Sequence, residues 1–215
     1  MTDVTDVTDD PGDRASVSPW IALIVLLIVH TAAGLGIDDP WLRVGVLDLF
    51  VLVAAWRVLD LRALFAAGDR GWAILLGLGC AGAMWGAGAV VYRVLSHVDS
   101  VWIEQVSEIL AWSEGRSLAF VLPMIALTVL CEELAWRGAV ALPLTRGLGP
   151  MRAGLVATLG YALAHAFAGP PILVLVAFGA GACWTALALW RGHLLAATLC
   201  HLAWDLLVFW LAPYA

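Results

Sequence analysis

Apolar residues fill most of the chain in long stretches, and short polar breaks rich in glycine and proline separate them. Each stretch has about 20 residues, which is the length that a helix needs to cross a membrane. Tryptophans lie near several of the expected ends, as in the aromatic belts of membrane proteins. The pattern predicts an all-α fold, a polytopic transmembrane helical bundle of about seven spans. The expected spans are residues 19–36, 42–59, 72–95, 118–146, 152–168, 171–190 and 193–212.

The composition supports a membrane protein. Of the 215 residues, 63% are apolar and only 13% are charged, and the mean hydropathy is +0.94. Soluble domains have roughly 45–50% apolar and about 25% charged residues, so a soluble domain of this size cannot bury the excess. The composition also excludes a chain that is disordered throughout. The formal charge is −6, so we expect no nucleic-acid partner, and the expected partner is the lipid bilayer.

Residues 1–17 are acidic and have no periodic apolar face, so we expect a disordered head. Arg57, Arg62 and Arg70 mark the loop after the second span as cytoplasmic by the positive-inside rule, which places the N-terminus in the cytoplasm. The chain has no lysine and is rich in arginine, alanine and glycine, which is typical of GC-rich bacterial genomes. The predicted location is therefore the inner (plasma) membrane of a bacterium.

The rest of the chain divides into two parts. Residues 18–117 hold the first three spans and an outer loop, and residues 118–215 hold the spans with the candidate chemistry. In the loop, residues 100–113 have apolar side chains at helical spacing, which predicts either an interfacial amphipathic helix or a short helix packed over the bundle. In the third span, Gly82 and Gly86 have the small-residue spacing of a close helix crossing.

Some polar and thiol side chains in the spans have structural explanations. No cysteine pair has CxxC spacing, so we expect buried free thiols. The cysteines are Cys80, Cys131, Cys183 and Cys200. His30 is expected to hydrogen-bond in the core, and Asp48 is a weaker candidate for an internal pair with Arg57.

Three of the last four spans carry titratable side chains in their interior, where a charge is costly and by default marks a functional site. These residues are Glu132, Glu133, Arg137, His165, His201 and Asp205. Glu133 and Arg137 are four residues apart, so they share a helix face and can pair, whereas Glu132 points about 100° away. His201 and Asp205 share a face in the same way. Each feature alone is common in ordinary proteins, but the set together favours a functional site.

The depth of the two glutamates depends on where their helix ends. If the helix stops at Arg137, Glu132 and Glu133 lie near the inner surface, below His165. If the helix continues to Leu144, they lie at mid-depth and the three groups can meet. We expect the longer, tilted helix.

Two chemistries fit this set of residues. In the first, a glutamate acts as general base on a water molecule with the help of a histidine, and the second histidine donates to the oxyanion of a peptide carbonyl. In the second, His165, His201 and a glutamate bind zinc, with another glutamate as the base. The chain lacks an HExxH motif, so we expect no metal and no other cofactor.

The same residues resemble the CPBP family, which comprises CAAX prenyl proteases of type 2 and bacteriocin-processing, ABI-like intramembrane proteases. Its pattern is EExxxR, FxxxH and HxxxN or HxxxD, each on its own transmembrane helix. In this chain Tyr161 takes the place of the Phe, and the third motif has its Asp form. The resemblance covers about residues 118–210. The matching residues are Glu132, Glu133, Arg137, His165, His201 and Asp205.

The resemblance implies an intramembrane endopeptidase of the glutamate type that cuts a membrane-associated protein or peptide, although the family has also carried the label metalloprotease. Glu132 and His165 would activate the water, and His201 with residue 205 would hold the oxyanion. An ionised carboxylate cannot donate to an oxyanion. Asp205 therefore either stays protonated or accepts from His201 and orients that ring, and we favour the second role.

The resemblance assigns Glu133 and Arg137 to structural or electrostatic support. Two alternatives come from other functional classes. One is a non-catalytic membrane scaffold or bacteriocin-immunity protein of the same fold. The other is a small transporter that uses the buried carboxylates as a proton relay, and the lack of a visible inverted repeat disfavours it.

Overall fold

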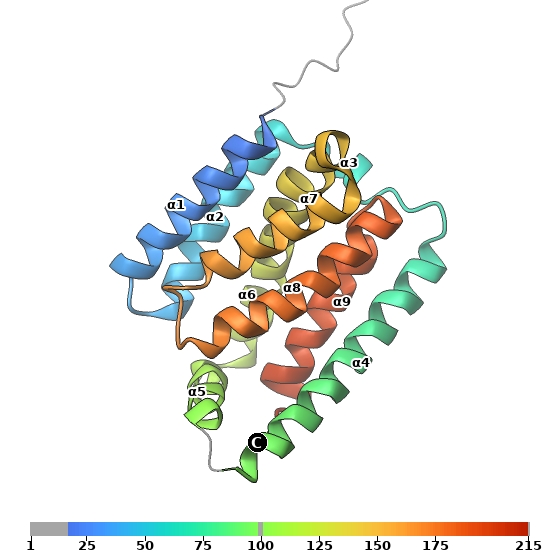
Figure 1. Cartoon of the computed structure of the whole chain (residues 1–215). Coiled ribbons are helices and arrows are strands. Elements are labelled where there is room, and N and C mark those ends of the chain that lie inside the picture. Colours follow the sequence, from blue (N-terminus) through green and yellow to red (C-terminus); the bar gives the residue numbers. More distant parts are fainter. Residues whose placement is uncertain (1–16, 99–100, 215) are drawn as a thin grey trace, which may run out of the picture.

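The computed structural model describes residues 17–98 and 101–214, and these residues form a bundle of helices (Figure 1). No strand occurs among them, so the predicted all-α fold is confirmed for the described residues. The predicted acidic head lies outside the described residues, except for Val17. The helical segments are α1 Pro19–Gly36, α2 Pro40–Val58, α3 Leu61–Leu64, α4 Arg70–Ser96, α5 Val101–Leu110, the short 3₁₀-helix η1 Ala111–Ser113, α6 Leu118–Glu132, the π-helix η2 Glu133–Ala141, α7 Leu142–Ala164, α8 Ile172–Arg191, α9 Leu195–Leu206 and the π-helix η3 Leu207–Leu211.

Local sequence signals set where several helices begin and end. α2 begins at Pro40, and the Asp39 carboxylate caps it by accepting a hydrogen bond of 2.8 Å from a backbone N–H of the first turn. Asp69 caps α4 through the Trp72 N–H at 3.0 Å. α8 ends at Gly192, whose φ of 69° lies in the left-handed region that glycine adopts without strain.

Among the described residues, four helical runs are long and apolar enough to cross a membrane: Pro19–Gly36, Arg70–Ser96, Leu118–Ala164 and Ile172–Arg191. The third run has 47 residues and contains two of the predicted spans, because the chain turns at Gly149 (φ 73°) between them. The last apolar run, Leu195–Leu211, is shorter. These helices indicate an integral membrane protein, whereas the count of seven spans stays a prediction.

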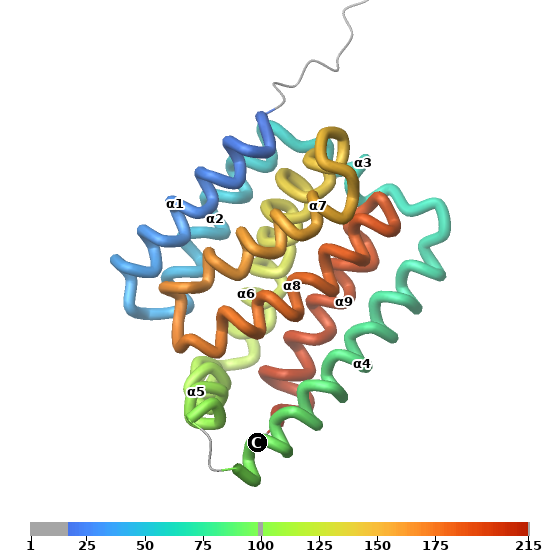
Figure 2. The backbone as a smooth tube through the Cα atoms, viewed as in Figure 1, coloured from blue at the N-terminus to red at the C-terminus, as the bar shows by residue number. Residues whose placement is uncertain are grey.

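The packing of the helices places the two glutamates in the interior. α4 lies along α9 on one flank, and α7 and α8 form an antiparallel pair beside them (Figures 1 and 2). α2 packs against α6, and α1 packs against α7. The π-helix η2 contacts α1, α2, α7 and α8, so the segment after Glu132 is surrounded on several sides.

α5 packs over the end of the bundle at which α8 begins (Figure 1). The Gln105 side-chain oxygen accepts a hydrogen bond of 2.9 Å from the Ile172 N–H, and Ile109 is buried. The loop predicted to contain a helix therefore does contain one. Its contacts favour the packed helix over the interfacial one.

The cysteines and His30 make the structural contacts that the sequence predicts. All four cysteines are free thiols. Cys131 and Cys200 are buried, whereas Cys80 and Cys183 are half-buried. His30 Nδ1 lies 2.8 Å from the carbonyl oxygen of the residue one turn earlier, which is a hydrogen bond within α1.

The close crossing of α4 lies at a different glycine from the predicted pair. A Cβ added at Gly77 would lie 2.7 Å from the Ala196 carbonyl oxygen and 3.0 Å from the Leu199 Cβ, both on α9. A Cβ at Gly82 or Gly86 would have nothing within 4 Å. The prediction of a crossing at Gly82 and Gly86 is wrong, because small-residue spacing does not reveal which glycines face a neighbouring helix.

We expect the substitution Gly77→Ala to lower the free energy of unfolding by about 1–3 kcal/mol, because the added methyl group must displace the backbone of α9. Gly82→Ala makes the same change where no atom is near and is expected to leave stability unchanged or slightly raised. Reversible denaturation in mixed detergent micelles measures both. Equal stability of the two variants would contradict this account of the α4–α9 contact.

Candidate active site

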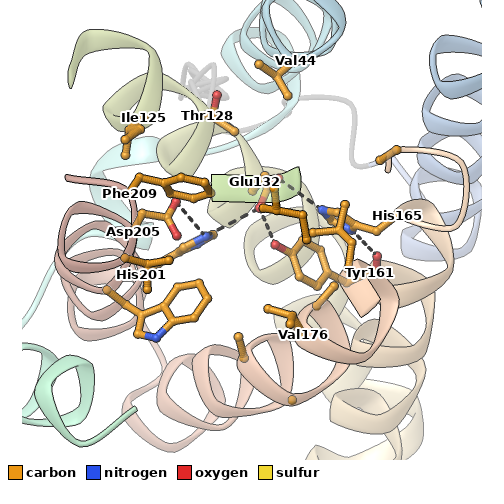
Figure 3. A pocket seen from close by; sticks show the side chains of 18 of the residues that line it. Val44, Ile125, Thr128, Glu132, Tyr161, His165, Val176, His201, Asp205 and Phe209 are labelled. Atoms are coloured by element: carbon orange, nitrogen blue, oxygen red, sulfur yellow. Dashed lines mark hydrogen bonds and ion pairs between the residues drawn. The ribbon is translucent and has the colours of Figure 1, made fainter. Parts of the chain in front are cut away.

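The three predicted groups meet around one pocket (Figure 3). Glu132 ends α6, His165 directly follows the last residue of α7, and His201 and Asp205 lie on α9. The helix of the two glutamates continues beyond Arg137 as η2 and leads into α7. The expected continuation of this helix is therefore confirmed, whereas its tilt and the depth of the glutamates stay predictions.

The π-helix begins between the two glutamates. The Leu142 N–H bonds to the Arg137 carbonyl oxygen five residues earlier, so the turn is wider than an α-helical turn. Glu132 lies just before this segment and its side chain is 16% exposed, whereas the Glu133 side chain is fully buried. The sequence placed the two carboxylates on different faces but gave no signal for the π-helix.

Glu132 is the carboxylate on which the other groups converge. Its Oε2 accepts a hydrogen bond of 2.6 Å from the Tyr161 hydroxyl. Its Oε1 lies 3.8 Å from His165 Nε2, and its Oε2 lies 3.8 Å from His201 Nε2. Both predicted histidines thus point a ring nitrogen at the predicted base, as the dashed lines in Figure 3 show.

The backbone fixes the tautomer of His165. Its Nδ1 lies 2.8 Å from the carbonyl oxygen of Tyr161, one turn earlier on α7. A carbonyl oxygen can only accept, so Nδ1 carries the proton. In the neutral ring Nε2 then has a free lone pair, and this nitrogen faces Glu132.

Glu133 orients His201. Its Oε1 lies 3.0 Å from His201 Nδ1, within hydrogen-bond range, whereas Asp205 Oδ2 lies 3.7 Å from Nε2. The ring also stacks on the Trp184 indole with centroids 3.4 Å apart. Glu133 thus makes the closer contact with the ring, and the expected role of Asp205 stays a prediction. Helical spacing reveals a neighbour four residues away but gives no sign of a carboxylate 68 residues away.

The predicted pairing of Glu133 with Arg137 is present and fully buried. Arg137 Nη1 lies 3.3 Å from Glu133 Oε1. Arg137 also donates from Nε to Thr185 Oγ1 at 3.2 Å and from Nη2 to the Gly181 carbonyl oxygen at 3.1 Å. Its guanidinium lies 4.5 Å from the centre of the Tyr161 ring. These contacts fit the supporting role that the resemblance implies.

A cavity of about 570 Å³ adjoins these residues, and most of its lining is apolar. Asp48 also lines it and accepts a hydrogen bond of 2.7 Å from the Thr128 hydroxyl, one turn before Glu132. Arg57 is exposed, so the considered pair of Asp48 with Arg57 is wrong. The sequence indicates Asp48 because a carboxylate in an apolar helix is unusual. It does not indicate the partner Thr128, because that contact depends on how α2 packs on α6.

The zinc alternative needs three or more donors around one point. Among residues 17–98 and 101–214, no group of three or more His, Cys, Asp or Glu side chains is arranged to hold a metal ion. His165 and His201 instead each lie within ion-pair distance of a different oxygen of Glu132. The zinc alternative thus gains no support from this geometry, and the expected lack of a cofactor stays a prediction.

We expect Arg137→Met to lower the free energy of unfolding by about 3–5 kcal/mol, because Glu133 is left as a buried charge without its cation. Adding Glu133→Gln to that variant is expected to restore part of the loss, because neither charge is then buried alone. A double-mutant cycle of denaturation in micelles measures this coupling. Strictly additive losses would show that the two side chains do not depend on each other.

A comparison with protein families identifies the part of the chain that carries the site. The family described as type II CAAX prenyl endopeptidase Rce1-like matches residues 114–207, which include all six predicted site residues and Tyr161. No curated protein and no solved structure matched the chain. The family is one of proteases, which supports a peptidase in the membrane. The match agrees with the family that the motifs indicate: residues 114–207 of this chain are similar to the Rce1-like type II CAAX prenyl endopeptidases.

Proposed function

We propose that the chain is an intramembrane endopeptidase in which Glu132, assisted by His165, activates water to hydrolyse a peptide bond. The observation that carries the proposal is the convergence at Glu132, where the Nε2 atoms of two histidines each lie 3.8 Å from a carboxylate oxygen beside a cavity. The substrate is a membrane-associated protein or peptide, and no metal takes part. The location is a bacterial inner membrane with the N-terminus in the cytoplasm.

The spacing of Glu132 and His165 suits a water molecule. Their facing atoms are 3.8 Å apart, so a water beside the line between them is within hydrogen-bond reach of both. Glu132 accepts a proton from this water while the water oxygen forms a bond to the carbonyl carbon. The carbonyl π electrons move to the oxygen. When the C–N bond breaks, the leaving amine takes the proton back and the carboxylate is regenerated.

His201 is placed to stabilise the oxyanion. Because its Nδ1–H donates to Glu133, Nε2 carries a proton only in the imidazolium form. In that form Nε2–H is a donor on the side of Glu132, and the carboxylates of Glu133 and Asp205 lie on either side of the ring to balance its charge. A preorganised donor in an apolar site contributes more than the same donor in water.

The cavity limits the class of substrate. An apolar lining favours apolar side chains or lipid-like groups, and it excludes strongly charged peptides because their desolvation is not compensated. Polar side chains gather at the site residues, where the scissile bond would lie (Figure 3). We therefore propose a peptide segment that is apolar next to its cleavage site.

We expect Glu132→Gln to lower the cleavage rate about 1,000-fold, because the amide cannot accept the proton of the water. The measurement compares peptide termini in the membrane and secreted fractions of cells that carry the wild type or the variant. Glu104→Gln makes the same change on the exposed face of α5 and is the matched control. If Glu132→Gln yields the wild-type set of termini, a non-catalytic scaffold replaces the protease proposal.

Asp205→Asn is expected to retain activity within about tenfold, because Glu133 already orients His201 through a 3.0 Å contact. His201→Ala is expected to lose about 100-fold or more, since it removes the oxyanion donor. The same comparison of termini, made quantitative, measures both variants. Complete loss in both would show that the two residues act as one unit.

A further inference from the structure

Tyr161 contacts the candidate base through its hydroxyl, although the family pattern has a phenylalanine at this position. We propose that the Tyr161 hydroxyl fixes the orientation of the Glu132 carboxylate, so that the oxygen beside His165 is aimed at the water whose proton it receives. This inference rests on the proposed function. It adds a positioning residue that the motif does not contain.

The two oxygens of Glu132 have different neighbours. The hydroxyl donates to Oε2 at 2.6 Å, which is the length of a hydrogen bond to a charged oxygen. Oε1 faces His165 Nε2 at the longer distance of 3.8 Å. Without the hydroxyl, the carboxylate plane could turn about its last bond, and neither oxygen would be held beside His165. With it, Oε1 stays beside His165.

The Tyr161 ring is itself held in place, so its hydroxyl has a fixed position. The Arg137 guanidinium lies 4.5 Å from the ring centre, and the Trp136 and His165 rings stand edge-on at 5.8 Å and 4.6 Å. On the α8 side, a Cβ added at Gly181 would lie 2.6 Å from Tyr161 Cδ1, so only glycine allows this approach. The buried charge pair and the base are thereby connected through one aromatic ring.

Tyr161 makes two contacts with the site, one through its backbone and one through its side chain, so a substitution can remove one and keep the other. Its backbone carbonyl accepts a hydrogen bond of 2.8 Å from His165 Nδ1–H, and the carbonyl of any residue at this position could do so. Only a tyrosine hydroxyl makes the bond to Glu132. Phenylalanine keeps the carbonyl, the ring contacts and the volume, so Tyr161→Phe removes the positioning bond alone.

The test uses the full chain in proteoliposomes and a synthetic peptide that spans the most abundant terminus lost in Glu132→Gln cells. Tyr161→Phe is expected to lower kcat about tenfold and to leave KM within about twofold, because the bond to a charged group is lost and substrate contacts are kept. Thermal denaturation in the same proteoliposomes is expected to stay within a few degrees of the wild type. A parallel change in KM, or a loss that follows the fraction of folded protein, would assign Tyr161 a structural role instead.

Infrared spectroscopy provides a readout that needs no substrate. The carboxylate band that disappears in Glu132→Gln belongs to Glu132, and Tyr161→Phe is expected to shift it. Tyr92→Phe removes a hydroxyl on α4, for which no hydrogen bond to a described residue is found, and is expected to leave the band unchanged. An unshifted band with wild-type kcat in Tyr161→Phe overturns this inference and leaves the proposed function intact, provided Glu132→Gln is inactive. Cleavage by Glu132→Gln overturns the proposed function itself.

Discussion

The buried ion pair of Glu133 and Arg137 is the constraint on which the site geometry depends. Both side chains are fully buried, and a charge left alone there would be strongly destabilising. Arg137 pairs with Glu133 within η2 and donates two hydrogen bonds to α8, to Thr185 and to the Gly181 carbonyl. Glu133 also accepts from His201 on α9. One pair of charges thus fixes the relative positions of three helical segments, and with them the rings that face the candidate base.

Adjacent glutamates take different tasks because their surroundings differ. The cavity reaches the Glu132 carboxylate, which suits its proposed action on water, whereas Glu133 is fully buried and contacts Arg137 and His201. The change from α- to π-helix occurs between them and widens the following turn, which leads the chain into α7 and to His165. Neighbouring residues already point about 100° apart on a helix, and the π-helix adds a wider turn after them.

The sequence indicates the candidate site residues because charges in apolar spans are few and costly, so each one stands out. It also predicts that Glu133 pairs with Arg137, because helical spacing alone determines that contact. It fails where a contact depends on how separate helices cross. The bond of Glu133 to His201, the hydroxyl of Tyr161 on Glu132 and the choice of Gly77 for the α4–α9 crossing all depend on side-chain directions after packing. The periodicity of the sequence does not predict these side-chain directions.

The apolar surroundings explain why so few polar groups suffice. Electrostatic interactions weaken as the local dielectric rises, so a donor aimed at Glu132 or at an oxyanion acts more strongly beside an apolar cavity than in water. The same surroundings penalise every polar group that lacks a partner, which restricts the site to side chains that hold one another. Within that restriction Glu132 has one oxygen bound by Tyr161 and one facing His165. Donors bound to both oxygens would make the carboxylate a weaker base, and a carboxylate with no donor would not keep its orientation in an apolar site.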